Sequence, residues 1–492
     1  MPIDVFLSGL KSQTIDLCTV DTISSFANIP YYYYYANDAD KPNFMPTELL
    51  QESLFATLAE FPILVGHLIM TDSGRAKVVV DKDSLNAPEL LESQSDIHFR
   101  DLQAAKFAWS ALPDGVATVG SMTTADAGGK IKFVNIHVVR LRENSGVVIF
   151  VNVPHYVVDG VGYCEFINRW AEVCRWMRAG EVPKKLSAYQ GSFSRDTLTK
   201  LLPNSCQALD DLTRELFTTS GLMSKWLAWI SPRTRGFVLS AVASLTSIEG
   251  HVFYLSARGL KALHALTQEH LSDGERITDN DILTALISMS VAQSEAECSQ
   301  EAVTGGYLAS LAAYLVPSLF APDRDFTTKF VCDARPRLPD LKAARYTGNT
   351  VFVRCLASKL KDLAGGITGQ SLTCEAKRVR QTVNGVDAQY IGQLFGTLNA
   401  DPSCFMCPIA QSVTKTTVVI SNQSRFTLYN TDFGNGKPVW VSPITTFYAN
   451  FVSILPAPPS DGGYTMFVTL SKQAMAKLLQ NEAWVNSVEL LY

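Results

Sequence analysis

The chain has 492 residues, of which 47% are hydrophobic, and a formal net charge of -5 at pH 7. This length predicts two or three globular domains, and the acidic balance argues against a nucleic-acid surface. No basic run suggests an anionic membrane, and no apolar run reaches the roughly 20 residues that cross a bilayer. Ten scattered cysteines and an N-terminus without a signal-peptide pattern predict a cytoplasmic protein with a small-molecule partner.

A cysteine pair and an apolar segment resemble familiar signals. Cys404 and Cys407 have the spacing of zinc and redox sites, but a structural zinc needs four ligands and no second close pair exists. We therefore expect no metal site. The apolar segment at 307–321 contains Pro317, which indicates a buried helix and turn.

The first elements along the chain predict a mixed sheet with helices. Five consecutive tyrosines at 31–35 predict a packed strand that buries some rings and leaves others in water, with a pocket lining as the alternative. Leucines spaced three or four residues apart predict a helix over 47–61, which ends before Pro62. Short strands follow at 64–70 and 76–80.

A β-hairpin is predicted next, from residues 131–141 and 147–153 across a turn at 142–146. The second strand is a run of β-branched and aromatic residues that favours burial on both faces. Pro154 ends this strand, and apolar residues at helical spacing over 163–177 predict a helix after it.

Two polar residues lie between this strand and this helix. His155 leaves the sheet at the end of the strand, and Asp159 immediately precedes Gly160 before the helix. Taken alone, His155 is equally well explained as a core histidine with satisfied hydrogen bonds. Asp159 is equally well explained as an N-cap, because a carboxylate accepts hydrogen bonds from the first helical amides.

The second half has the same mixed character. Periodicity weakens from 184 to 235, which predicts a long crossover between the halves. Beyond it, strands and helices alternate with glycine-containing turns: a strand at 251–255, helices at 258–271 and from 278, strands at 330–338 and 418–422, and turns at 346–350 and 429–438. We predict an α+β fold with an N-terminal domain at 1–200, a linker at 201–236 and a C-terminal domain at 237–492.

Six segments in this order resemble the BAHD family of CoA-dependent acyltransferases over almost 400 residues. His155-Tyr156-Val157-Val158-Asp159-Gly160 is similar to the family's HxxxDG signature, and Asp432-Phe433-Gly434-Asn435-Gly436-Lys437-Pro438 is similar to its C-terminal glycine loop. The other four are the helix and turn at 52–68, Asn280-Asp281, Asp333-Ala334-Arg335-Pro336-Arg337 and Tyr346-Thr347-Gly348-Asn349. Six ordered matches are far more specific than any one of them.

The resemblance implies two similar domains like those of chloramphenicol acetyltransferase, each a mixed sheet flanked by helices, with an active-site tunnel between them. Acyl-CoA enters as co-substrate from one face, and a small-molecule alcohol or amine enters from the other. It implies no bound cofactor and no acyl-enzyme. Members of this family are usually monomers, so the resemblance also implies a monomer.

Roles for individual residues follow from this resemblance. A neutral imidazole can take the proton of a hydroxyl that attacks a thioester, so His155 is the expected general base. Ser421 aligns where the family often has a threonine near the reacting centre, and it is the expected oxyanion donor. Asp159 is expected to pair with Arg335, with Arg337 as the alternative, and to shape the site. Asp432, Gly434 and Gly436 are expected to give structural support.

The sequence departs from the plant pattern at Asn435 and Gln423, where many plant members have tryptophan, and it is longer around 294–324. These features are more like fungal members and leave the acceptor open. Besides O-acylation, three alternatives remain: N-acylation of an amine, condensation from a carrier-protein thioester, and a non-catalytic binding protein. Pro154 argues against the condensation reaction, because condensation-type enzymes have another histidine at this position.

Overall fold

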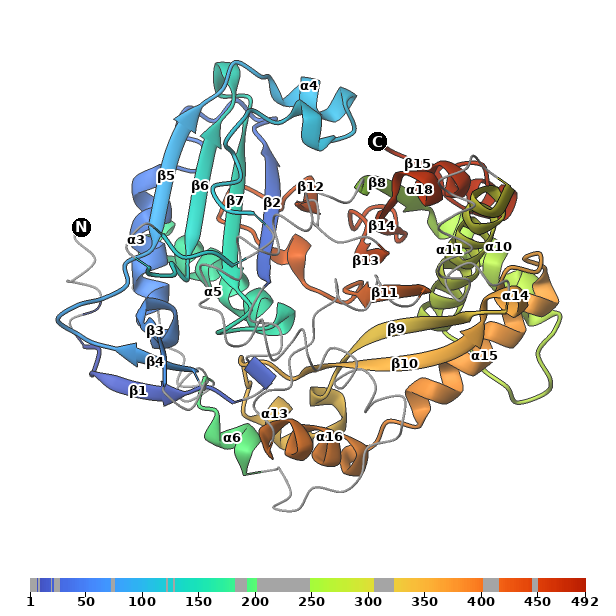
Figure 1. The fold of residues 1–492 in the computed structure, drawn as a ribbon. Helices are drawn as coiled ribbons and strands as arrows, with labels where there is room; N and C mark the ends of the chain where they lie inside the picture. Colours follow the sequence, from blue (N-terminus) through green and yellow to red (C-terminus); the bar gives the residue numbers. More distant parts are fainter. Residues whose placement is uncertain are drawn as a thin grey trace.

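The computed structural model describes residues 7, 9–18, 20–21, 27–71, 76–120, 123–126, 129–181, 193–200, 248–304, 323–400, 416–444 and 450–492. Three sequence predictions fall outside these residues: the linker at 201–236, the apolar segment at 307–321, and the Cys404–Cys407 pair. The described residues form two mixed sheets with flanking helices and one small sheet (Figure 1). The predicted α+β fold of two mixed-sheet domains is confirmed.

The first sheet has five strands in the order β12-β2-β7-β6-β5. The bounds are β2 Asn28–Ala36, β5 Glu89–Gln94, β6 Asn135–Arg140, β7 Gly146–Pro154 and β12 Trp440–Pro443. The predicted hairpin is present as antiparallel β6 and β7. Two helices, α3 Thr47–Leu58 and α5 Gly160–Arg178, share one hydrophobic core with this sheet, and Figure 1 shows them on the same side of it.

The five tyrosines of β2 are all buried, with at most 7% of any residue exposed. The prediction that some rings remain in water was therefore wrong. Tyr31, Tyr33 and Tyr35 lie in the core beneath the helices, whereas Tyr32 and Tyr34 pack in a second cluster on the opposite face. That second face is covered by Phe107 and Trp440 and other residues that lie far from β2 in the sequence, so alternation along the strand did not reveal it.

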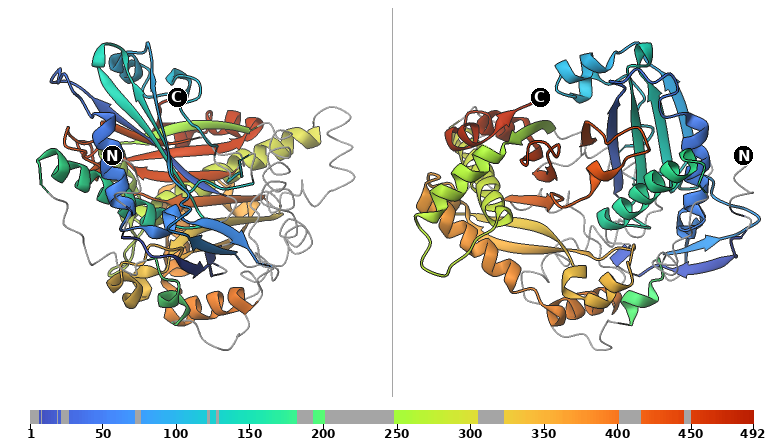
Figure 2. Two further views of the ribbon diagram at one scale, coloured as in Figure 1. Left: turned by 90° about the vertical axis from the view of Figure 1, so that its left-hand side faces the viewer. Right: turned by 180° about the vertical axis from the view of Figure 1, so that it is seen from behind.

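The second large sheet has seven strands in the order β10-β9-β11-β13-β14-β8-β15. Its strands are β8 Ile248–Leu255, β9 Asp325–Asp333, β10 Val351–Lys359, β11 Thr416–Asn422, β13 Phe451–Pro456, β14 Tyr464–Ser471 and β15 Glu489–Leu490. Helices α10 Ala257–Gln268, α11 Asp279–Thr304, α15 Gly369–Asn384 and α18 Lys472–Leu478 contribute to its core. The rotated views show these helices gathered at the side of the molecule away from the first sheet (Figure 2).

Shorter elements complete the described chain. The small sheet pairs β1 Gln13–Asp16, β4 Ala76–Val80 and β3 His67–Met70. The remaining helices are α4 Phe99–Ala104, α6 Asp196–Thr199, α13 Pro339–Ala343, α14 Leu360–Leu363, α16 Ala388–Ala400 and α19 Glu482–Ser487. The 3-10 turns are η1 Pro62–Val65, η2 Trp109–Ala111, η3 Arg142–Asn144, η6 Arg335–Arg337 and η7 Leu428–Asn430.

One strand connects the two halves. β12 comes from the C-terminal part of the chain but pairs antiparallel with β2, from Trp440 opposite Tyr34 to Pro443 opposite Tyr31. The first sheet is therefore completed by a strand that lies beyond residue 400 in the sequence. The domain limits at 1–200 and 237–492 remain a prediction. β12 belongs to the C-terminal range but pairs in the sheet of the N-terminal range.

Candidate active site

His155 lies at the end of β7, where the chain turns into α5. β7 is buried along its whole length, and the backbone N–H of His155 donates to the carbonyl of Ala27 at 2.9 Å. Asp159 is the N-cap of α5, and its Oδ1 accepts hydrogen bonds from the amides of Val161 at 3.1 Å and Gly162 at 3.0 Å. The strand and the cap together fix both ends of the short turn that carries His155.

The Asp159 carboxylate is also paired with an arginine from the second half of the chain. Arg335 donates from Nη1 to Oδ2 at 2.8 Å and from Nη2 to Oδ1 at 3.0 Å, and both side chains are buried. Burial raises the pKa of Asp159, but Arg335 and backbone amides outweigh it, so the pKa lies below its ordinary value. Arg337 instead donates to the backbone carbonyls of Val386 and Val383.

Asn349 holds the imidazole of His155. Nδ1 of the ring lies 2.9 Å from Asn349 Oδ1, and Nδ2 of the same amide donates to the His155 carbonyl at 2.7 Å. Burial lowers the pKa of His155 below its ordinary value, and the opposing effects of Asn349, Asp159 and Asp21 do not cancel this. This shift favours the neutral form of the imidazole at pH 7.

An ion pair lies behind Asn349. Arg195 donates to Asp21 with Nη2 at 2.8 Å, and both residues are buried. The same Nη2 donates to the carbonyl of Val157 at 2.9 Å, two residues after His155. The N-terminal segment, the segment at 193–200 and the turn after β7 are joined here.

Ser421 lies on β11 of the second sheet and is linked to the first sheet by two hydrogen bonds. Gln423 Nε2 donates to Ser421 Oγ at 3.0 Å, and the Tyr31 hydroxyl donates to Gln423 Oε1 at 2.5 Å. Burial raises the pKa of Tyr31, so its hydroxyl remains protonated and can donate. The ring of Tyr31 packs against Tyr163 of α5, with 5.3 Å between centroids. Ser421 is thus connected to the strand that pairs with β7.

The glycine loop at 432–436 is closed by its own aspartate. Asp432 Oδ1 accepts from the amides of Gly434 at 2.7 Å and Gly436 at 3.0 Å. Both glycines have positive φ, +92° and +110°, which side-chain-bearing residues rarely adopt. The intervening Phe433 packs against Trp170 of α5 with 4.7 Å between ring centroids. The loop therefore supports α5, the helix that Asp159 caps.

Close packing at the start of α5 explains its two glycines. A methyl group on Gly162 would overlap the carbonyl of Thr347, and one on Gly160 would overlap the ring of Phe426. Thr347 belongs to the turn that supplies Asn349, and Phe426 follows β11, which carries Ser421. The absence of side chains at these positions allows both segments of the second half to approach the His155 turn.

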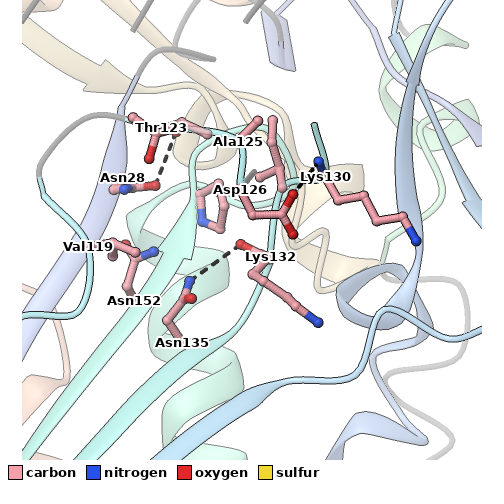
Figure 3. Close-up of a pocket in the computed structure, with 12 residues that line it drawn as sticks. Asn28, Val119, Thr123, Ala125, Asp126, Lys130, Lys132, Asn135 and Asn152 are labelled. Carbon is pink, nitrogen blue, oxygen red and sulfur yellow. Dashed lines mark hydrogen bonds between the residues drawn. The ribbon is translucent and has the colours of Figure 1, made fainter. Parts of the chain in front are cut away.

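A pocket that is open to solvent and lined by both polar and apolar side chains lies at this end of the first sheet (Figure 3). Pro154, which directly precedes His155, is one of the residues that line it. Asn28, Asn135 and Asn152 contribute from neighbouring strands, as Figure 3 shows, together with residues of the loop at 119–132. No aromatic side chain lines this pocket, in contrast to the tyrosine cluster on the other face of the sheet.

Within the described ranges, no group of three or more His, Cys, Asp or Glu side chains is arranged to hold a metal ion. None of the helices described is both long and apolar enough to cross a membrane.

The structure brings most of the predicted site residues together around one turn. His155, Asp159 and Arg335 form a continuous region with the turn at 346–350, whereas Ser421 is linked through Gln423 to Tyr31 of β2. Sequence reasoning missed the contacts of three residues. Asn349 belonged to a recognised motif but had no assigned role, and neither Asp21 nor Arg195 lies in a local pattern that indicates a site.

Comparisons with known proteins match nearly the whole chain. The Transferase family model matches residues 8–199 and 246–484. A hydroxycinnamoyltransferase of Narcissus pseudonarcissus is 22% identical over 485 residues, covering 95% of this chain and 94% of the relative. A hydroxycinnamoyl-CoA:5-hydroxyanthranilate N-hydroxycinnamoyltransferase of Avena sativa is 23% identical over 470 residues, covering 91% and 90%.

Solved structures show the same fold. TRI101 of F. sporotrichioides, crystallised with coenzyme A and T-2, matches with a TM-score of 0.73 at 16% identity, covering 98% of this chain and 100% of that chain. Vinorine synthase matches with a TM-score of 0.60 at 14% identity, covering 96% and 97%. The family match spans most of the sequence and includes every motif that the structure gathers around His155. The chain belongs to the Transferase family, the BAHD acyltransferases.

Proposed function

We propose that the protein transfers an acyl group from acyl-CoA to a hydroxyl of a small-molecule acceptor, with His155 as general base. The observation that carries this proposal is the neutral imidazole of His155, held at Nδ1 by Asn349 at the junction of the two halves. Nδ1 is occupied, so Nε2 is the nitrogen available to a substrate. The curated relatives include transferases of hydroxycinnamoyl groups.

The proposed reaction proceeds in a ternary complex. His155 takes the acceptor's proton as the acceptor oxygen forms a bond to the thioester carbon. The carbonyl oxygen becomes an oxyanion, and its collapse breaks the carbon–sulfur bond. The protonated imidazole then returns the proton to the departing CoA thiolate, so the base is regenerated and no acyl-enzyme forms.

Ser421 is the proposed donor to the oxyanion. Its Oγ accepts a hydrogen bond from Gln423, so its own hydroxyl hydrogen is available for another acceptor. The donation from Tyr31 to Gln423 Oε1 fixes which end of the amide faces Ser421. A chain of hydrogen bonds therefore points from Tyr31 through Gln423 to Ser421, in the direction that an oxyanion requires.

Asp159 and Arg335 have a proposed structural role. Arg335, Thr350 and the first amides of α5 all donate to the Asp159 carboxylate, which leaves it poorly placed to act as an acid or base. The pair ties the His155 turn to the turn that supplies Asn349. Asp432, Gly434 and Gly436 support the same helix from the other side.

Several finer points of the proposal rest on the family. The tunnel, the domain limits at 1–200 and 237–492, the cytoplasmic location and the monomeric state remain predictions. An amine acceptor stays open, because two of the curated relatives are N-hydroxycinnamoyltransferases and the same base serves both nucleophiles.

The test is release of free CoA from a panel of acyl-CoAs, with pooled hydroxylated metabolites and matched amines as acceptors. Wild type should give acceptor-dependent release that His155→Ala loses, about 10²-fold or more. His67→Ala, which removes a half-buried imidazole hydrogen-bonded to the Ser84 carbonyl, is the matched control and should behave as wild type. Equal release by wild type and His155→Ala would reject the base assignment, and preference for the amines would move the proposal to N-acylation.

A further inference from the structure

Asp21 lies beneath the residue that holds the catalytic imidazole. Its carboxylate is fully buried and accepts from Arg195 Nε at 3.0 Å and Nη2 at 2.8 Å. Its Oδ1 also accepts from Asn349, from the backbone N at 3.3 Å and from Nδ2 at 3.0 Å. Cys18 adds its backbone amide to Oδ2 at 3.0 Å. The position of this carboxylate is thus fixed by hydrogen bonds from three separate segments.

This arrangement determines which way the Asn349 amide points. Its Nδ2 lies between the Asp21 carboxylate and the carbonyl oxygen of His155, two groups that only accept hydrogen bonds. The reversed orientation would place the amide oxygen against both of them and lose both hydrogen bonds. Asn349 Oδ1 must therefore face the imidazole.

The amide in turn determines the tautomer of His155. An amide oxygen can only accept, so the ring nitrogen 2.9 Å away must carry the hydrogen. Nδ1 is the protonated nitrogen, and Nε2 has the free lone pair. Only this tautomer can receive a proton at the nitrogen that faces away from Asn349.

We propose that Asp21 is a positioning residue that acts through Asn349 to hold His155 in the Nδ1–H tautomer. This inference rests on the proposed function, in which His155 Nε2 takes the acceptor's proton. Arg195 compensates the buried charge of Asp21 and also holds the Val157 carbonyl, so the same ion pair supports the turn after His155.

A neutral amide between the carboxylate and the imidazole has a chemical consequence. A carboxylate in direct contact with Nδ1 strongly stabilises the imidazolium, whereas an amide oxygen orients the ring with a weaker effect on its charge. The burial that lowers the pKa of His155 is therefore only partly opposed. The site keeps its base deprotonated and in one tautomer, even though two buried carboxylates lie nearby.

The tautomer can be measured directly by ¹⁵N NMR of histidine-labelled full-length protein. The chain has seven histidines, and the His155 ring signals are assigned by their loss in His155→Gln. Wild type should show a protonated Nδ1 and an unprotonated Nε2. In Asp21→Asn, the new amide can donate to or accept from Asn349, so the Nε2–H tautomer should appear as well.

Two further variants make the experiment decisive. Asn349→Ala removes the acceptor for Nδ1–H but keeps the Asp21–Arg195 pair, and it should also give mixed tautomers if Asp21→Asn does not fold. Asp281→Asn removes another buried carboxylate, at the start of α11, and should leave the His155 signals unchanged. A wild-type spectrum with a protonated Nε2, or an unchanged tautomer in both Asp21→Asn and Asn349→Ala, would overturn the inference.

Turnover separates this inference from the proposed function. Asp21→Asn should lower kcat, with little change in KM, in proportion to the share of molecules that lose the Nδ1–H tautomer, so an equal mixture of the two tautomers should give about a 2-fold fall. If His155→Ala keeps full acceptor-dependent activity, the base assignment fails regardless of the tautomer. If His155→Ala is inactive while Asp21→Asn keeps both the wild-type tautomer and kcat, only the positioning role of Asp21 fails.

Discussion

The two sides of the proposed reacting centre are built from different interactions. On the His155 side, Asp21 pairs with Arg195 and Asp159 pairs with Arg335, and all four side chains are buried. On the Ser421 side, the contacts run through two hydroxyls and one amide, from Tyr31 to Gln423 to Ser421. Both sides join segments from the two halves of the chain.

The comparison separates stability from catalysis. A buried ion pair that loses one member leaves an uncompensated charge, which is strongly destabilising. A neutral chain that loses one member costs about one hydrogen bond, so the protein should remain folded while the transition state suffers. We therefore expect variants on the His155 side to affect folding as well as activity, and variants on the Ser421 side to affect mainly kcat.

The largest effect should come from Arg335→Ala. Removal of the guanidinium leaves the Asp159 carboxylate buried without its main partner, and we expect a loss of about 3–5 kcal/mol in the free energy of unfolding. Urea denaturation measures it. Lys359→Ala, which breaks an exposed pair with Asp325, is the control and should change stability little. Similar effects of the two variants would mean that burial does not distinguish this pair.

Ser421→Ala should lower kcat by about 10²–10³-fold, the range typical of a lost oxyanion donor, and leave the unfolding midpoint nearly unchanged. Steady-state kinetics with the best acyl-CoA provides the measurement. Ser421→Thr keeps the hydroxyl and should recover most of the activity. A Ser421→Ala enzyme with unchanged kcat would remove Ser421 from the mechanism.

Tyr31→Phe should have a smaller effect, because it acts only through Gln423. One lost hydrogen bond is worth about 0.5–1.5 kcal/mol, which corresponds to roughly a 2- to 10-fold fall in kcat. The same change in a Ser421→Ala background should cause no further fall, since the donor that it orients is gone. Additive effects in this double-mutant cycle would show that Tyr31 acts independently of Ser421.

The smallest expected effect is on the pH dependence of kcat/KM. Because burial lowers the pKa of His155, its base form predominates at pH 7 and is lost as pH falls through a pKa below 6.5. The acidic limb of kcat/KM should therefore have an apparent pKa below 6.5. Asn349→Leu removes an interaction that raises this pKa and should shift the limb to still lower pH. A limb above 6.5 would contradict the neutral-base assignment.

Local pattern was sufficient for much of the fold. The hairpin of β6 and β7 and the helices α3 and α5 lie close to their predicted positions, because hydrophobic period and proline placement act over a few residues. The burial of all five tyrosines in β2 was missed. It depends on β12 and the residues around Phe107, which reach that face only in the folded chain.

The sequence by itself determined the family and the residues that carry the proposed chemistry, since the motifs that contain His155, Asp159 and Asp432 can be recognised in order along the chain. Only the tertiary structure decided which side chains contact these residues. Arg335 and not Arg337 meets Asp159, and Asn349 and not a carboxylate meets His155. The contacts around the proposed reacting centre join residues as many as 392 positions apart, such as Tyr31 and Gln423. A hydrogen bond depends on the distance and direction between two atoms, and for distant residues the packing of the sheets and helices decides both.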